Sequence, residues 1–255
     1  MKQPARKAEL ARLLNDAHAA CLLPDALCEA NPDPLLVARE LPDDAALVCA
    51  LFAYGNVKAI VGFLKSLDFS LLDADEQTIA AALNNHRYRF QTPSDVAALF
   101  AGLARLRRSG VQLRTLFEAT YQNEGFLCAL SALIGTVREA VGTQSGGIGF
   151  LIGQPFDCRA LGGVSALKRW LMFLRWMVRR EAPDLGRWQA VTPADLLMPL
   201  DTHTFRLGRE LGLIARKSSD LKAAIELTDA LKKFDPADPL KYDFALYRLG
   251  QGEKK

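Results

Sequence analysis

Apolar residues recur at helical spacing along almost the whole chain, and this periodicity is the strongest constraint on its fold. After Thr92, for example, one apolar stripe runs through Val96, Leu99 and Leu103, as on a helix that buries one face. Thr92 and Pro93 are typical of a helix start, because threonine caps backbone N–H groups and proline suits the first helical position. We find no convincing pair of strands. The sequence therefore predicts an all-α fold.

The same reasoning places most of the helices. In the first part of the chain, helices are expected over 5–22, over 44–67 with an interruption at Gly55-Asn56, after Thr92, and once or twice in 112–141. In the second part they are expected over 166–181, over 193–198, after Asp201 as far as Gly212, over 220–233, and after Asp238-Pro239 as far as about Gly250. Thr192-Pro193-Ala194-Asp195 repeats the start signal found at Thr92. The Pro- and Asp-rich residues 24–44 are predicted to form a loop with short turns.

The most glycine-rich stretch of the chain, GTQSGGIGFLIGQPFD, covers residues 142–157. It contains Gly147-Ile148-Gly149, but no βαβ pattern surrounds these glycines, so a nucleotide-phosphate loop is not expected. We predict a surface connection here.

Composition excludes several classes of protein. No apolar run approaches the roughly 20 residues that span a membrane, and the charged, helical N-terminus does not resemble a signal peptide. The 5 cysteines are scattered and odd in number, which predicts reduced, mostly buried thiols in a cytoplasmic protein. Without a C-x-x-C pair or histidines at ligand spacing, we expect no cofactor and no metal. At 255 residues the chain is long enough for one large domain or two smaller ones.

The net charge of +3 is mild, but its distribution is uneven. Residues 159–180 carry no acid and six cations, which are Arg159, Lys168, Arg169, Arg175, Arg179 and Arg180. Such a stretch either binds phosphates or forms a solvated helix face.

Lys168 lies near the start of its expected helix, among apolar neighbours and beside Arg169. Partial burial, a helix N-terminus and a cationic neighbour favour the neutral amine, which is the nucleophilic form. A neutral lysine attacks an electrophilic carbon, such as C1′ of a deoxyribose, and forms a Schiff base. The alternative is a lysine that extends to solvent or contacts a phosphate.

Asp201 follows Pro199-Leu200 and opens the next long helix. As the N-terminal cap it would accept backbone N–H bonds, which favour the ionised carboxylate. Such a carboxylate stabilises an oxocarbenium-like sugar or takes a proton from the nucleophile. The alternative is a purely structural cap.

Together these motifs carry a family resemblance. Lys168 to Arg175, which fits K-x-x-x-x-F-L-R, and Leu200-Asp201-Thr202-His203 resemble the helix-hairpin-helix DNA glycosylase superfamily, in particular its 8-oxoguanine glycosylase/lyase branch. Residues 168–179, 199–204 and 241–250 also resemble a bacterial family of unknown function. Residues 161–168, LGGVSALK, depart from the superfamily hairpin, because Ser165 or Ala166 stands in place of its second glycine.

The resemblance implies two helical subdomains around a central cleft, approximately 1–44 with 205–255, and 45–204. It implies a base-excision glycosylase with β-lyase activity, in which Lys168 attacks C1′ and Asp201 assists. The remaining roles are assigned by position: contact with DNA for Gly163, Ser165, Arg169, Arg175, Arg179, Tyr54 and Asn56, of which Tyr54 or Asn56 enters the base stack, and the base pocket for Trp170, Tyr242 and Phe244. A core position is the alternative for Trp170 and Phe244.

The expected partner is double-stranded DNA with a damaged base or an abasic site, bound by a monomer that works in the cytoplasm at the nucleoid. Two other hypotheses stay open. One is a non-catalytic protein that binds DNA lesions or structures on the same fold. The other is a helical protein–protein adaptor that does not contact DNA.

Overall fold

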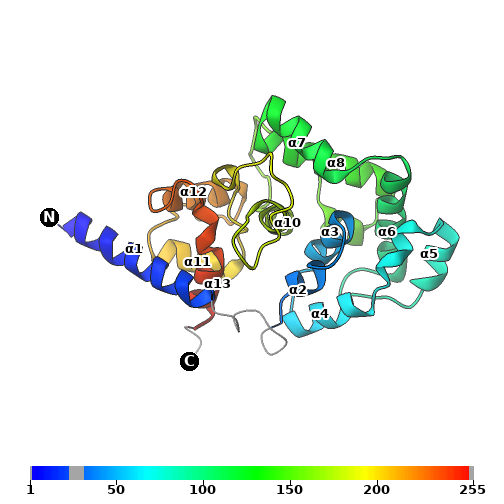
Figure 1. Cartoon of the computed structure of the whole chain (residues 1–255), viewed down its shortest axis with the longest axis horizontal. Coiled ribbons are helices and arrows are strands. Elements are labelled where there is room, and N and C mark those ends of the chain that lie inside the picture. Colours follow the sequence, from blue (N-terminus) through cyan, green and yellow to red (C-terminus); the bar gives the residue numbers. More distant parts are fainter. Residues whose placement is uncertain (1, 23–31, 253–255) are drawn as a thin grey trace. The chain divides into compact units, whose positions relative to one another are not determined.

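The computed structural model describes residues 2–22 and 32–252, and it confirms the all-α class (Figure 1). These residues form thirteen α-helices and three short 3-10 helices, and they contain no strand beyond two isolated β-bridges. None of the described helices is both long enough and apolar enough to cross a membrane.

The chain divides into two compact units. Unit 1 consists of Met1–Asn31 and Leu161–Lys255, and unit 2 consists of Pro32–Ala160. The sequence placed the divisions near residues 44 and 204 instead. The segment 161–204 belongs to unit 1 because its side chains pair with later residues of that unit; Arg179, for example, binds Asp238 through two N–H groups.

Unit 2 contains the helices α2 to α9. Their bounds are α2 Pro34–Ala38, α3 Asp43–Leu51, α4 Val57–Ser66, η2 Phe69–Asp73, α5 Glu76–Ala82, α6 Pro93–Arg108, α7 Leu113–Glu124, α8 Phe126–Val141 and α9 Gly146–Ile152. Helix α8 contacts both α6 and α7, and α2 contacts α3 (Figure 1). Every residue of α3 from Ala45 to Leu51 is buried, so this helix forms the centre of an apolar core.

The expected start and break signals of unit 2 are confirmed. The Thr92 hydroxyl accepts the Asp95 N–H, and the Asp95 carboxylate accepts the Thr92 N–H at 2.8 Å, which together form a capping box on α6. The chain breaks between α3 and α4, where Asn56 caps α4 by accepting the N–H groups of Lys58 and Ala59.

The glycine-rich stretch was predicted to be a surface connection. It also contains a helix, α9. Ser145 caps this helix by accepting the N–H of Ile148 at 3.0 Å. Ile148, Leu151 and Ile152 are buried at helical spacing. Their burial outweighs the low helix propensity of the glycines.

The prediction of reduced cysteines is wrong for one pair, since Cys128 and Cys158 form a disulfide within unit 2. Cys21 and Cys49 are buried free thiols, as expected. Burial raises the pKa of the Cys49 thiol, against the opposing effect of a backbone hydrogen bond. Cys28 lies outside the described residues.

Unit 1 contains the first helix of the chain and the last four. Their bounds are α1 Lys2–Cys21, α10 Lys168–Val178, η3 Pro193–Asp195, α11 Thr202–Glu210, α12 Leu221–Lys232, η4 Pro239–Tyr242 and α13 Asp243–Gly252. Helix α13 contacts α1 and α11 (Figure 1). The helix expected over 193–198 is only the single 3-10 turn η3, in which the Thr192 hydroxyl accepts the Ala194 N–H.

Candidate functional site

Lys168 is the first residue of α10 and is half-buried. Its neighbour Leu167 has a φ of +49°, a left-handed conformation that is uncommon for a residue with a branched side chain. A β-bridge between Ser165 and Asp220 fixes the turn that leads to Lys168; in it, the Leu221 N–H donates to the Val164 carbonyl at 3.1 Å. The amine is therefore carried by a turn that is attached to the start of α12.

The turn before Lys168 has a left-handed glycine at Gly163, with a φ of +76°. Gly163 and Ser165 are exposed. However, no helix forms between Gly153 and Leu167, so a helix does not directly precede this turn. The first helix of a helix-hairpin-helix unit is thus missing at this position.

Asp201 is the N-terminal cap of α11, as predicted. Its Oδ1 accepts the Thr204 N–H at 2.8 Å, and the residue is half-buried. This single bond occupies one lone pair of one oxygen, so the carboxylate has capacity for a second role.

A buried carboxylate that the sequence did not single out lies within electrostatic range of these two residues. Asp243 is 7 % exposed at the start of α13. Burial raises the pKa of its carboxyl; the charge of Arg175 and, more weakly, that of Lys168 oppose the rise, and the charge of Asp201 adds to it. Lys168 and Asp201 therefore lie close enough to the same carboxyl for both of their charges to act on it.

Arg175 and Arg179 are inside unit 1, with exposures of 3 % and 2 %. Arg175 Nε donates to Asp184 at 3.1 Å and Nη1 donates to Asp243, while Arg179 Nη1 donates to Asp184 at 2.6 Å. Arg179 also binds Asp238 at 2.8 Å. The prediction that these two arginines hold DNA phosphates is wrong, because both guanidinium groups are buried and carboxylates of unit 1 already accept from them.

The base-pocket prediction is wrong for two residues. Trp170 and Tyr242 are 2 % and 1 % exposed, so they are core side chains, and the Tyr242 hydroxyl donates to Asn15 at 3.0 Å. Phe244 is half-buried, and the guanidinium of Arg175 lies 4.4 Å from its ring centroid. Contact of Phe244 with a base stays a prediction.

Three predicted DNA contacts on α10 and its turn remain accessible. Gly163 and Ser165 are exposed and Arg169 is half-buried. Their binding of phosphate stays a prediction. Because Arg175 and Arg179 are internal, Gly163, Ser165 and Arg169 are the remaining predicted DNA contacts on α10 and its turn.

Tyr54 and Asn56, which were expected at the base stack, belong to unit 2. The Asn56 side chain caps α4, as described above, although the residue is exposed. Tyr54 is half-buried, and its hydroxyl donates to the Gln91 side chain.

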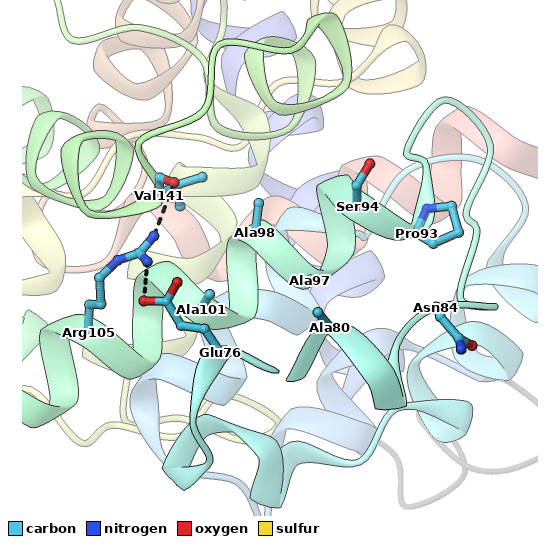
Figure 2. A pocket seen from close by; sticks show the side chains of 10 residues that line it. All are labelled: Glu76, Ala80, Asn84, Pro93, Ser94, Ala97, Ala98, Ala101, Arg105 and Val141. Carbon is cyan, nitrogen blue, oxygen red and sulfur yellow. Dashed lines mark hydrogen bonds and ion pairs between the residues drawn. The ribbon is translucent and has the colours of Figure 1, made fainter. Parts of the chain in front are cut away.

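Unit 2 also has a surface groove of about 600 Å³ between α5 and α6, shown in Figure 2. Ala80 of α5 and Ala97, Ala98 and Ala101 of α6 are among its lining residues. At one side Arg105 Nη1 donates to Glu76 at 2.5 Å and Nη2 donates to the Val141 carbonyl at 3.3 Å (Figure 2). None of the predicted site residues lines this groove. Within the described parts of the chain, no group of three or more His, Cys, Asp or Glu side chains is placed to hold a metal ion.

Residues 33–252 match the family described as "Protein of unknown function (DUF2400)". Because the match covers most of the chain, the protein belongs to this family. Comparison with curated proteins and with solved structures found no match.

Proposed function

We propose that this protein is a DNA-repair glycosylase with β-lyase activity, and that unit 1 carries its active site. The observation that carries the proposal is the placement of Lys168 at the start of α10 and of Asp201 at the N-terminal cap of α11 within the same unit, both near enough to the buried Asp243 to affect the pKa of its carboxyl. A nucleophile, Lys168, and a carboxylate, Asp201, thus come from two different helices and lie in the neighbourhood of Asp243. Active sites are the places where such interacting titratable groups gather.

In the proposed reaction, the Lys168 amine attacks C1′ of a nucleotide whose base has been flipped out of the duplex. A bond forms between Nζ and C1′ as the N-glycosidic bond breaks, and its electron pair leaves with the base. Asp201 stabilises the positive charge that develops on the sugar and accepts the proton that the amine releases. The nitrogen lone pair then forms the C1′–N double bond as the C1′–O4′ bond breaks and O4′ takes up the proton that Asp201 accepted, which gives a protonated Schiff base. A C2′ proton is then lost, the C3′–O bond breaks, and the 3′ phosphate leaves by β-elimination.

Asp243 and Arg175 support this site from inside unit 1. Arg175 neutralises Asp243 and joins it to Asp184, so the carboxyl next to the reacting pair is held in place. A buried, paired carboxylate does not reorganise when charge develops nearby, which is the condition for electrostatic preorganisation.

The proposed substrate is double-stranded DNA with a damaged base or an abasic site, which a monomer binds at the nucleoid. The backbone N–H groups around Gly163, the Ser165 hydroxyl and Arg169 are the proposed phosphate contacts. Phe244 is the remaining proposed contact with the extruded base, since Trp170 and Tyr242 are buried.

The test is borohydride trapping on duplexes that carry abasic, 8-oxoguanine, uracil or alkylated sites. We expect a covalent protein–DNA adduct with the native chain on at least one duplex. Lys168→Ala is expected to abolish the adduct, and Asp201→Asn to slow its formation about 10²- to 10⁴-fold, the usual contribution of a general base. Lys222→Ala is the matched control, because Lys222 is an exposed lysine on α12 of the same unit. Absence of a Lys168-dependent adduct on every duplex contradicts the proposal.

A second candidate function is binding of DNA lesions without catalysis. The turn before Lys168 favours it, because no helix precedes this turn and Ser165 is bridged to Asp220. This candidate predicts salt-dependent duplex binding that Lys168→Ala and Asp201→Ala leave unchanged. Duplex binding without any trapped adduct would support it over the lyase.

A further inference from the structure

Unit 2 presents a group of aromatic rings at its surface, around a tight turn that the sequence did not single out. Phe90 is 60 % exposed and Phe150 is 44 % exposed. Together with Tyr54 and Arg89 they form what we call the Phe90 surface. Large apolar side chains that stay exposed on a well-packed unit are candidates for binding.

The turn is held firmly although its tip is exposed. Tyr88 and Gln91 exchange backbone hydrogen bonds of 3.1 and 2.8 Å, which leaves Arg89 and Phe90 as a two-residue tip. Arg89 has a φ of +49°. A non-glycine residue held in this left-handed region costs free energy and persists where the surroundings enforce it, often at functional positions.

Gln91 connects the turn to the other two segments of the Phe90 surface. Its side chain is fully buried; it accepts the Tyr54 hydroxyl and donates to the Gly147 carbonyl at 2.9 Å. The Tyr88 hydroxyl donates to the Tyr54 carbonyl at 2.6 Å. The rings of Tyr54, Phe90 and Phe150 are therefore carried by a backbone that is fixed before any ligand binds, which lowers the entropic cost of binding.

Two of the three rings are parallel, and the third packs against them edge-on. Tyr54 and Phe90 are parallel to within 8°, with centroids 6.3 Å apart, and Phe150 packs edge-on against both at 5.0 and 5.2 Å. The Arg89 guanidinium lies 5.7 Å from the Tyr54 centroid and 5.5 Å from that of Phe90. Exposed ring faces beside a guanidinium offer a flat ligand both stacking and a positive charge.

The two segments that carry Tyr54 and Phe90 have several cationic side chains, while the nearby Asp95 is buried. Residues 54–67 contain Lys58 and Lys65 and no acid, and residues 84–94 contain Arg87 and Arg89 and no acid. All four cations are exposed. Residues 146–153, which carry Phe150, have no charged side chain. Aromatic faces within a positively charged surface are complementary to a polyanion that carries flat rings.

We infer that the Phe90 surface binds single-stranded nucleic acid, with unpaired bases stacked on Phe90 and Phe150 and the backbone phosphates near Arg87, Arg89 and Lys58. Bases in a duplex are already stacked on each other. The unpaired bases of a single strand can instead stack on exposed aromatic side chains. This site lies in unit 2 and does not depend on the chemistry proposed for Lys168.

The test uses the full chain and fluorescein-labelled oligonucleotides of about 15 nucleotides, which is within the length that one such surface covers. The probes are oligo-dT, oligo-U, a blunt duplex, and an oligomer of abasic residues that keeps the phosphates but lacks bases. Anisotropy titration is expected to show at least about tenfold tighter binding of oligo-dT or oligo-U than of the duplex and of the abasic oligomer. The comparison of dT with U decides which of the two nucleic acids is the better ligand. Equal binding of the abasic and base-carrying oligomers would overturn the inference.

Substitutions at the tip of the turn separate stacking from simple apolar contact. Phe90→Leu is expected to weaken oligo-dT binding about tenfold, whereas Phe90→Trp retains binding because it keeps a flat ring. Arg89→Ala is expected to lower the slope of log affinity against log salt by about 0.7, the loss of one phosphate contact on a single strand. Val111→Ala and Arg159→Ala are matched controls, since both are exposed residues of unit 2 outside the Phe90 surface. Unchanged binding by Phe90→Leu, or equal loss by Phe90→Leu and Phe90→Trp, contradicts stacking.

Failure of this inference is distinguishable from failure of the proposed lyase. Lys168→Ala is expected to bind oligo-dT as the native chain does, and Phe90→Leu is expected to keep the Lys168-dependent adduct on at least one lesion. Circular dichroism of each variant checks that the helices are retained.

Discussion

The two units differ in the burial of the arginines that pair with two or more carboxylates. In unit 1, Arg175 and Arg179 lie inside, 3 % and 2 % exposed, and both pair with the buried carboxylate of Asp184. In unit 2, Arg107 binds Asp44 and Asp73 with 28 % of its side chain exposed, at the rim of an apolar core. The basic stretch of the sequence is thus partly internal. Four exposed cations of unit 2 instead accompany exposed rings, so the local density of arginine in a sequence does not show which arginines reach the surface.

Both units nevertheless share one backbone feature. Leu167 in unit 1 and Arg89 in unit 2 are the non-glycine residues with positive φ in the described parts of the chain. One directly precedes Lys168, and the other directly precedes Phe90. Each unit therefore places an unfavourable backbone conformation next to the side chain on which its proposed activity depends.

The largest effect should come from the buried charges of unit 1. Asp184 accepts from both Arg175 and Arg179. Asp184→Ala is expected to lower the free energy of unfolding by about 3–5 kcal/mol, because it leaves buried positive charge without its partner. Urea denaturation followed by circular dichroism measures this loss.

The matched control for the buried charge lies in unit 2. Asp73 is 69 % exposed and pairs with Arg107 at 2.6 Å. Asp73→Ala is expected to cost less than about 1 kcal/mol, as exposed pairs do. If Asp184→Ala and Asp73→Ala lower the free energy of unfolding by similar amounts, burial of the arginine does not determine how much its ion pair contributes to stability.

A smaller change in the free energy of unfolding is expected when the apolar packing of unit 2 is disturbed. A Cβ on Gly102 of α6 would come within 2.8 Å of the Val141 Cα and 2.9 Å of its N, so backbone has to move. Gly102→Ala is expected to cost about 1–3 kcal/mol in urea denaturation. Gly62→Ala in α4 is the control of opposite sign, because no atom lies within 4 Å of its Cβ position and alanine favours the helix by about 0.5–1 kcal/mol. Destabilisation by Gly62→Ala, or tolerance of Gly102→Ala, would refute this account of the packing.

The smallest effect concerns the start signal that occurs once in each unit. Although burial alone would raise it, the pKa of Asp95 is lowered, because the Ser145 hydroxyl and the Thr92 N–H and hydroxyl donate to its carboxylate. A carboxyl whose pKa is lower in the folded state stabilises that state at pH values above its unfolded pKa of about 3.9. This stabilisation is lost as the pH falls through the lower, folded-state pKa. Asp95→Asn should therefore cost about 1 kcal/mol at neutral pH and progressively less in acid.

The comparison for this carboxylate is Asp195 in unit 1, which follows Thr192 at the same spacing but is exposed in a 3-10 turn. Asp195→Asn is expected to change the free energy of unfolding by less than about 0.5 kcal/mol at either pH, as surface substitutions usually do. Urea titrations at neutral pH and below about pH 3 decide the matter. A cost of Asp95→Asn that does not change with pH would exclude the ionised capping box as its cause.

Features that depend on a few neighbouring residues were predictable from the sequence. The cap at Thr92 requires only Asp95 three positions later, and the cap at Asp201 requires only Thr204. The break at Gly55-Asn56 is equally local, since Asn56 bonds to Lys58 and Ala59. Short-range hydrogen bonding decides such positions whatever the rest of the fold does.

Features that depend on distant residues were not predictable. Arg175 meets Asp243 across 68 positions, and Cys128 meets Cys158 across 30. Nothing near Arg175 in sequence shows that its donors are occupied. Asp243 itself gives a weak signal, as an acid in the otherwise apolar run Tyr242 to Leu246. A carboxylate at such a position needs a cation, and a helix with two arginines on one face supplies it.

The order of the chain has a consequence for synthesis. Helix α1 packs on α13, and Asn15 bonds to Tyr242 across 227 positions, whereas unit 2 is made of one continuous segment. On the ribosome, all residues of unit 2 are therefore made before α1 has its partner. At about 5–20 residues per second, α1 waits roughly 10–45 s for the first residues of α13. Of the two units, unit 1 is therefore the second that can become native, although it contains α1.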